Sequence, residues 1–198
     1  MKKFIVLDNI FDGMSQRIIK ERLLDNSFPW YFIKDVTLDD NCEQERPAFA
    51  HYFVIRDHFD QPKVNSDFND IVSEIKRCIS TKLKLKNDME VLQARSFLQL
   101  PLSEKEQTLD TAHVDIVDKE HFVFLYYVTD NDAETVIYDN TSLSENMTEL
   151  TRVKPKQGRV VIFNGKYYHT AEQPKKNIRC VVNMDVSITK DMIENLQI

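Results

Sequence analysis

Two histidines and an aspartate stand at spacings that suit a metal centre. His113 and Asp115 are separated by one residue, and His169 follows after a run of strand-like segments. Two imidazoles and one carboxylate can occupy one face of a six-coordinate ion and leave the other positions open, as in non-heme Fe(II) sites. Arg179 lies ten residues after His169. Its planar guanidinium can hold a dicarboxylic acid through two parallel hydrogen bonds.

A second His-x-Asp pair, His58-Phe59-Asp60, competes with the first. It precedes a proline, in a turn before a predicted helix, where no sheet fixes its side chains. If this pair supplied the first ligands, His113 would be the distal histidine. The tenth residue after His113 is Val123, which cannot bind a carboxylate. We therefore favour the set that ends in Arg179.

Arg179 stands inside an apolar run, between Ile178 and Cys180. A charge there is costly to bury without a partner, which either an incoming dicarboxylate or an internal ion pair with Asp185 would supply. Strand alternation places Asn183 on the same face as Arg179. We expect Asn183 either to orient a metal ligand or to be an ordinary core amide.

Two amphipathic helices are predicted before position 90, both packing against a sheet. The first has Asp12 as a cap and apolar positions Met14, Ile18, Ile19 and Leu23. The second has Ser66 or Asp67 as a cap and an apolar stripe made of Phe68, Ile71, Val72, Ile75, Ile79 and Leu83. A short closing helix is predicted at the C-terminus, with Thr189 as its cap and Ile193 and Leu196 on its apolar side.

From Val91 onward the pattern changes to short strand-like runs, which indicates a sandwich or jelly roll. Two earlier runs, Phe4 to Leu7 and Phe49 to Ile55, are also read as strands. The later runs are Val91 to Leu100, Phe122 to Val128, Thr135 to Tyr138, Val160 to Phe163 and Cys180 to Val186. His51 and His121 lack a partner at ligand spacing and are interpreted as surface or packing histidines.

The composition is that of an ordinary globular protein. A net charge of −6 argues against nucleic acid as a partner. No apolar stretch is long enough for a membrane span, and the run from Phe4 to Leu7 is too short for a signal peptide. Three scattered cysteines, Cys42, Cys78 and Cys180, fit reduced thiols. We expect a cytoplasmic protein.

The ordered set His113-x-Asp115, His169 and Arg179 resembles the 2-oxoglutarate/Fe(II)-dependent dioxygenase superfamily, specifically its prolyl 4-hydroxylase-like branch. The resemblance covers Val91 to Val186, and more loosely Leu7 to Phe32. It is carried by three further stretches: Leu125-Tyr126-Tyr127-Val128, Ala133-Glu134-Thr135-Val136 where many members have Gly-Gly-x-Thr, and Gly158 to Phe163 before the distal histidine. The missing glycine pair, and Val181 in place of a hydroxyl residue, are departures.

The resemblance implies a mostly β fold with flanking helices (α+β), built on a double-stranded β-helix core of jelly-roll or cupin-like type. It implies one domain over residues 1–198: a helix-rich part (1–90) packing on the sheet, the core (91–188) and a C-terminal helix (189–198).

It also implies that His113, Asp115 and His169 bind Fe(II), and that Arg179 holds the distal carboxylate of 2-oxoglutarate. Tyr127 either donates a hydrogen bond to that carboxylate or is a packed aromatic residue. The expected activity is hydroxylation of an unactivated C–H bond with release of succinate and CO2, and ascorbate as a reductant.

Two other functions stay open: a jelly-roll binding or scaffold module without chemistry, and a cupin-like metalloenzyme that does not use 2-oxoglutarate. The substrate of an enzyme would be a peptidyl proline, another protein side chain or a small molecule. The polar stretches Asp35–Glu45 and Pro101–Thr111 are expected to form lids over it. The sequence does not determine the oligomeric state.

Overall fold

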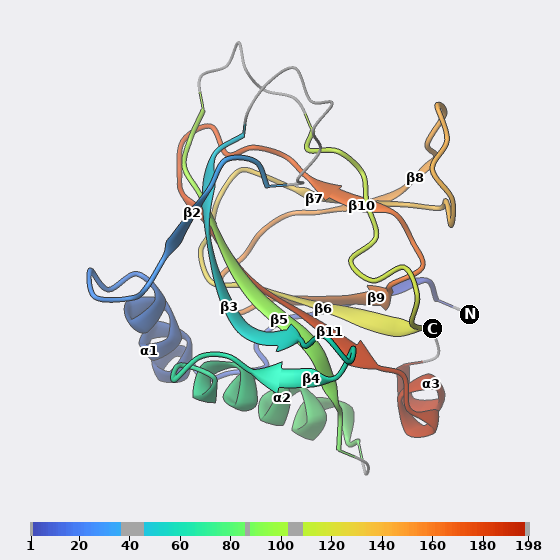
Figure 1. Ribbon diagram of the computed structural model, residues 1–198, viewed down its shortest axis with the longest axis horizontal. Coiled ribbons are helices and arrows are strands. Elements are labelled where there is room, and N and C mark those ends of the chain that lie inside the picture. The colour runs from blue at the N-terminus through green and yellow to red at the C-terminus, as the bar shows by residue number, and fades with distance from the viewer. Residues whose placement is uncertain (1, 37–45, 86–87, 103–108, 197–198) are drawn as a thin grey trace.

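The computed structural model describes residues 2–36, 46–85, 88–102 and 109–196. Its strands form a large and a small antiparallel sheet that face each other, and three helices cover the outer face of the large sheet (Figure 1). The large sheet has the order β1 (Phe4–Leu7), β9 (Val160–Asn164), β6 (His121–Tyr127), β11 (Arg179–Ser187), β5 (Val91–Gln99), β3 (Ala48–Arg56) and β2 (Tyr31–Ile33), with β4 (Pro62–Val64) paired to β3. The small sheet has the order β10 (His169–Ala171), β7 (Thr135–Tyr138) and β8 (Glu149–Val153).

Strand alternation divides the core into two parts. Even-numbered positions of β6, from Phe122 to Tyr126, pack against the helices together with Cys180, Val182 and Met184 of β11. Odd-numbered positions of β6 and β11, among them Val123, Leu125 and Val181, face the small sheet instead. Because successive side chains of a strand point to opposite faces, one strand serves both layers. The inner face is the one that carries Arg179 and Asn183.

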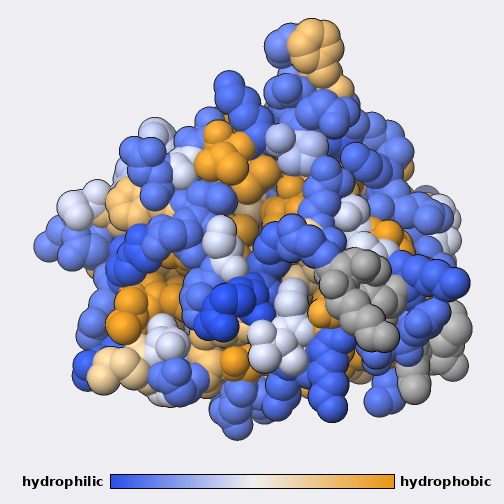
Figure 2. Space-filling view, turned by 90° about the horizontal axis from the view of Figure 1, so that it is seen from below, coloured by the Kyte–Doolittle hydropathy of each residue, from blue (hydrophilic) through white to orange (hydrophobic). Residues whose placement is uncertain are grey.

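Helices α1 (Gly13–Leu23) and α2 (Asp70–Leu83) supply the outer layer. The Asp12 side chain accepts hydrogen bonds from the backbone of Met14 and Ser15, so the predicted cap of α1 is confirmed. The apolar stripe of α2 is likewise confirmed, because Ile71, Val72, Ile75 and Ile79 are buried. Seen from the helical side, the surface is mostly hydrophilic with apolar patches between (Figure 2).

Several helix predictions need correction. Met14 and Ile18 are exposed, so only Ile19 and Leu23 of α1 enter the core. Helix α2 begins later than expected, with Asn69 at its N-cap and no side-chain hydrogen bond there. The residues just before α2 form a turn, in which the Ser66 hydroxyl accepts a hydrogen bond from the backbone N–H of Phe68.

The closing helix α3 (Lys190–Leu196) exists, but it buries Met192 and Leu196 and leaves Ile193 exposed.

Residues 1–90 were expected to be helix-rich, yet they also contribute β1, β2, β3 and β4 to the large sheet. The sheet is therefore not confined to residues 91–188. Of these strands, β2 and β4 were not predicted, nor were β8 and β10. Strands β2, β4 and β10 have three residues each, too few to show alternation, and β8 has five residues of which only Val153 is buried. Within the described part of the chain, no helix combines the length and apolar character that crossing a membrane requires.

Candidate metal centre and its cavity

The two ligand histidines are brought together by backbone pairing. His113 lies at the end of a segment, starting at Leu109, that runs antiparallel to β10. Its backbone N–H donates to the His169 carbonyl at 3.0 Å. The His169 N–H donates back to the His113 carbonyl, also at 3.0 Å. Residues opposite each other in such a pair carry their side chains on the same face. The imidazole centroids consequently lie 4.7 Å apart.

Hydrogen bonds fix which ring nitrogen of each histidine is free. Nδ1 of His113 lies 3.0 Å from the Thr111 carbonyl, and Nδ1 of His169 lies 3.3 Å from the Tyr167 carbonyl. A carbonyl only accepts, so both Nδ1 atoms carry hydrogen, and in the unprotonated ring each Nε2 atom presents a lone pair. These point toward Asp115: Nε2 of His169 is 3.2 Å from Oδ2, and Nε2 of His113 is 3.9 Å from Oδ1.

This donor set fits a metal cation. One ligand atom from each of His113, Asp115 and His169 can be chosen so that all three lie within 4.8 Å of one another. Two neutral imidazole nitrogens and a carboxylate oxygen are all acceptors, and a cation at their common centre satisfies them together. Two imidazoles and one carboxylate are also the ligands that non-heme Fe(II) takes.

The electrostatics of the site favour the metal-binding protonation states. Burial opposes ionisation of Asp115, but His169 in its protonated form and the Arg95 guanidinium outweigh it and hold the pKa of Asp115 well below its usual range. Burial lowers the pKa of His113, and the neighbouring His169 lowers it further. An ionised carboxylate and an unprotonated imidazole are the forms that bind a metal.

Two side chains hold Asp115 in place. The Asn183 amide donates to Oδ2 at 3.1 Å, and Arg95 approaches Oδ1 to 2.5 Å through Nη2. Of the two roles considered for Asn183, its contact with Asp115 favours the first, in which it orients the carboxylate of a candidate metal ligand.

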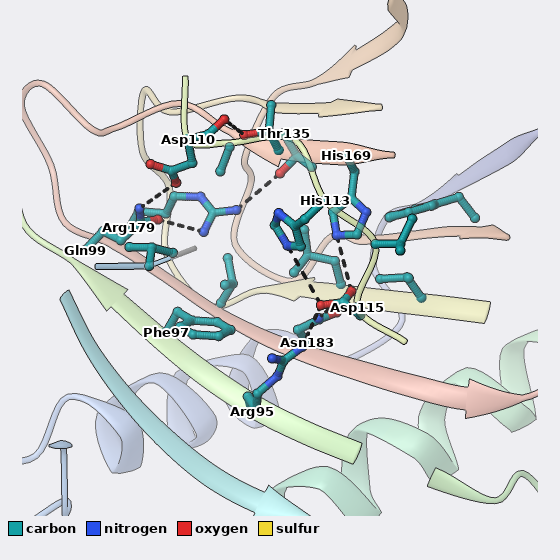
Figure 3. A pocket seen from close by; sticks show the side chains of 18 residues that line it. Arg95, Phe97, Gln99, Asp110, His113, Asp115, Thr135, His169, Arg179 and Asn183 are labelled. Atoms are coloured by element: carbon teal, nitrogen blue, oxygen red, sulfur yellow. Dashed lines mark hydrogen bonds and ion pairs between the residues drawn. The ribbon is translucent and has the colours of Figure 1, made fainter. Parts of the chain in front are cut away.

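A cavity of about 240 Å³ extends from this centre toward the start of β11. Figure 3 shows Arg179, Gln99, Asp110 and Thr135 at one end, and the histidines with Asp115, Asn183 and Arg95 at the other. The wall between the two ends is largely apolar and is formed by Phe97, Val123, Leu125, Phe163 and Val181.

Arg179 is a buried cation without a carboxylate partner among the described residues. Nη1 donates to the Gln99 side-chain oxygen at 3.0 Å and Nη2 to Thr135 Oγ1 at 3.3 Å. Both acceptors are neutral, and Nε has no partner. Burial lowers the pKa of Arg179, as expected for a charge removed from water.

The two carboxylates that might have neutralised Arg179 are engaged elsewhere. Asp110 accepts from Gln173 at 2.6 Å, from Arg46 at 3.0 Å and from Gln99 at 3.2 Å. Asp185, the alternative partner considered from the sequence, accepts from Gln93 at 2.7 Å and has Arg95 and His121 as charged or titratable neighbours. The internal ion pair between Arg179 and Asp185 is therefore absent from the structure.

Of the two roles considered for Tyr127, the structure favours the packed aromatic residue. Its hydroxyl donates to Thr135 Oγ1 at 2.7 Å, and it is Thr135 that lines the cavity. Burial raises the pKa of Tyr127 to about 12, so the phenol stays protonated. Tyr127 thus holds the Thr135 side chain by a hydrogen bond and does not itself line the cavity.

The remaining histidines fall outside the site. His58 is exposed in the turn before β4, and Asp60 beside it pairs with Arg56. His51 is buried among Phe28, Phe53 and Phe68, as a packing histidine.

His121 is buried near Asp185. Gly165 covers its ring so closely that a Cβ there would lie 2.1 Å from Nε2 of His121.

Sequence reasoning missed several cavity residues: Arg95, Phe97, Gln99, Asp110 and Thr135. The first three share one face of β5, so the period-two alternation of that strand was a usable signal. Thr135 stands in the Ala133–Val136 stretch that carries the family resemblance, which was a usable signal too, whereas Asp110 carried none because only the fold brings it to the cavity. Of the proposed lids, Asp35, Val36, Pro101, Leu102 and Leu109 to Thr111 are described, while the other residues lie outside the described part of the chain.

No known protein family and no curated protein matches the sequence. Solved structures do resemble the fold. An oxidoreductase of the 2OG-Fe(II) oxygenase family from Burkholderia pseudomallei has a TM-score of 0.69 at 11% identity, over 93% of this chain and 85% of that one. A prolyl hydroxylase from Trichoplax adhaerens, in complex with a hypoxia inducible factor peptide, has 0.64 at 11%, over 96% and 85%. A viral collagen prolyl hydroxylase from Paramecium Bursaria Chlorella virus-1, in a 2OG complex, has 0.57 at 13%, over 94% and 97%.

The chain thus has the fold of 2-oxoglutarate/Fe(II) oxygenases, and several of the matching structures are prolyl hydroxylases. This confirms the expected fold class, mostly β with flanking helices around a double-stranded β-helix. Inside that fold, His113, Asp115 and His169 form a candidate facial triad.

Proposed function

We propose that the protein is an Fe(II)- and 2-oxoglutarate-dependent dioxygenase that hydroxylates an unactivated C–H bond. One observation carries the proposal: a three-acceptor cation site and a buried, uncompensated arginine stand at the two ends of one cavity. A cation at one end and a guanidinium at the other suit a dicarboxylate that spans them.

Each residue has a defined task in this reaction. His113, Asp115 and His169 would hold the metal, which, together with 2-oxoglutarate, supplies oxygen activation coupled to release of succinate and CO2. Arg179 would bind the distal carboxylate of the co-substrate, with Gln99 and Thr135 fixing the guanidinium. Asn183 and Arg95 keep Asp115 oriented. The apolar wall excludes water from the reacting carbon.

The finer assignments rest on the resemblance and on the chemistry of the site. Fe(II) is the metal that two imidazoles and one carboxylate suit best among oxygen-activating ions. Peptidyl proline is the substrate suggested by the likeness to prolyl hydroxylases, and other protein side chains or small molecules fit the same reaction. Ascorbate would serve as the reductant that keeps the metal as Fe(II).

Succinate formation tests the proposal. Purified protein with Fe(II), ascorbate, oxygen and 2-oxoglutarate should release succinate, and Asp115→Ala should abolish that release. Asp118→Ala is the matched control, because Asp118 is an exposed aspartate three residues away whose described ion pair is with Arg56. A second readout is thermal stabilisation by Mn(II) plus 2-oxoglutarate. Succinate release that survives in Asp115→Ala, or a wild-type protein that neither ligand stabilises, would refute the assignment.

A further inference from the structure

Arg95 is a second cation on the cavity wall, and it lies at the metal end. It shares the inner face of β5 with Phe97 and Gln99, and its guanidinium carbon sits 5.5 Å from the centre of the Phe97 ring. In Figure 3 it stands beside Asp115 and Asn183, at the opposite end of the cavity from Arg179. The two arginines thus flank the space available to ligands.

Arg95 is paired with Asp115, the same carboxylate that would bind the metal. Nη2 lies 2.5 Å from Asp115 Oδ1 but 3.7 Å from Asp185 Oδ2, and that Asp185 oxygen already accepts from Gln93 at 2.7 Å. Nε of Arg95 is buried and has no hydrogen-bond partner in the part of the chain that the structure describes. A single carboxylate charge on Asp115 cannot fully balance both a divalent cation and a guanidinium.

The cavity between the two arginines selects a particular kind of molecule. Its wall is apolar, with Phe97 and Phe163 among the lining residues, so it accepts a carbon skeleton. With Arg179 committed to the co-substrate, Arg95 is the remaining cationic side chain among the described residues that line the cavity. An arginine with unused N–H groups prefers a carboxylate, which it binds through two hydrogen bonds.

We propose that Arg95 binds a carboxylate of the substrate, so that the carbon to be hydroxylated lies close to an acidic group. This inference rests on the proposed function and narrows its substrate class. The carboxylate belongs either to a free acid, such as an amino acid derivative, or to an aspartate or glutamate side chain of a peptide. An internal peptidyl proline without a neighbouring acid would not engage Arg95.

The inference is tested by measuring the affinity of matched pairs of probe molecules for protein loaded with Mn(II) and 2-oxoglutarate. Mn(II) takes the place of Fe(II), so that the probes bind without being turned over. One arm uses N-acetyl amino acids and their primary amides. The other uses short peptides with an internal Asp or Glu and their Asn or Gln counterparts. We expect acids of one arm to bind at least about tenfold more tightly than their amides, the difference that one charged hydrogen-bond pair provides. Which arm shows the preference identifies the source of the carboxylate.

Arg95→Gln should remove the acid preference, and Arg95→Lys should restore part of it because it keeps the charge. Arg77→Gln, a change of the same kind on the exposed surface of α2, should leave the preference intact. Amides that bind as well as acids in both arms would overturn the inference. So would an acid preference that survives in Arg95→Gln, or a loss of Mn(II) affinity in that variant as large as its loss of acid affinity. Failure of the proposed function would appear earlier, as a wild-type protein that binds neither Mn(II) nor 2-oxoglutarate.

Discussion

Arg179 and Asp115 are both buried charges, but the protein compensates them differently. Asp115 has the Arg95 guanidinium as a counter-charge and the Asn183 amide as a hydrogen-bond donor, so its charge is compensated before any ligand arrives. Arg179 has only neutral acceptors. A buried ion without a counter-ion costs stability, and an arriving anion recovers that cost as binding energy. The Arg179 end should therefore govern the affinity for a dicarboxylate.

Arg179→Lys should weaken 2-oxoglutarate binding while leaving Mn(II) binding unchanged. Lysine keeps the charge but lacks the planar fork, so it gives up one of two parallel hydrogen bonds. We expect the half-saturating 2-oxoglutarate concentration to rise at least about tenfold. Titration of Mn(II)-loaded protein measures it. Arg159→Lys, which alters the ion pair with Asp8 outside the cavity, is the control. Unchanged 2-oxoglutarate affinity in Arg179→Lys would contradict the assignment.

Thr135 and Tyr127 should differ in their effect on the same affinity. Thr135 Oγ1 accepts from both Tyr127 and Arg179 and lines the cavity, whereas the Tyr127 hydroxyl contacts only Thr135 among the described residues. Thr135→Val removes the acceptor of Arg179 and should weaken 2-oxoglutarate binding more than Tyr127→Phe does. The same titration compares them. A larger loss in Tyr127→Phe would mean that the phenol itself reaches the co-substrate.

At the level of elements, Gly165 packs against His121 at the start of β6, and of the three glycines it leaves the least room for a Cβ. A Cβ on Gly165 would lie 2.1 Å from Nε2 of the buried His121, and the Gly165 N–H also donates to the His121 carbonyl. Gly165→Ala should lower the free energy of unfolding by about 1–3 kcal/mol or more, since the ring has no room to move.

Gly13→Ala is the control for that experiment. Gly13 opens α1, and a Cβ there would meet nothing within 4 Å. Alanine favours a helix by up to about 1 kcal/mol over glycine, so this variant should be neutral or slightly more stable. Urea unfolding of both variants against wild type provides the measurement. Equal stability of the two variants would show that His121 can move aside.

The elements that the sequence predicted are those with a clear apolar pattern. Strands β6 and β11 were found as runs rich in aromatic and β-branched residues, as were the shorter β1, β7 and β9, and α2 was found because its buried positions recur every three or four residues. β10 has three residues and was missed, although it carries His169. β10 pairs with the segment that contains His113, which is more than 50 residues away in the sequence, and no local sequence pattern predicts such a long-range pairing.

The site was predictable where chemistry dictates residue type, and not where packing does. His113, Asp115, His169 and Arg179 stand out by type and spacing, and the structure places all four around one cavity. For Tyr127 the sequence leaves two roles open, a contact with the co-substrate or a packed aromatic ring, because it cannot tell which side chain stands in front of another. In the structure Thr135 lines the cavity and Tyr127 donates to it.

At the scale of the whole molecule, the large sheet ties the N-terminal strands to the metal centre. β3 pairs with β5, which carries Arg95, and β5 pairs with β11, which carries Asn183 and Arg179. Helices α1 and α2 pack on the opposite face of the same sheet. The residues that hold Asp115 therefore depend on the packing of the N-terminal half.

The stability of the whole molecule should depend on pH through its buried histidines. Burial lowers the pKa of His51, whose ring contacts the Pro29 carbonyl and the Ser66 hydroxyl. In the unfolded chain a histidine titrates near about 6.5. Below that value the unfolded chain binds a proton that the folded chain resists, so the contribution of His51 is present above pH 6.5 and is lost as the pH falls. Asp185, whose pKa burial raises, acts in the opposite sense.

His51→Gln compared with wild type isolates this contribution, because both proteins keep Asp185. Between about pH 7.5 and 5.5, a window that brackets the unfolded histidine pKa, the free energy of unfolding should fall less in His51→Gln than in wild type. Urea unfolding of the metal-free proteins at several pH values measures the two slopes. His58→Gln, which changes an exposed histidine in the turn before β4, should keep the wild-type slope. A His51→Gln slope equal to that of wild type would mean that the folded protein accepts a proton at His51 as readily as the unfolded chain does.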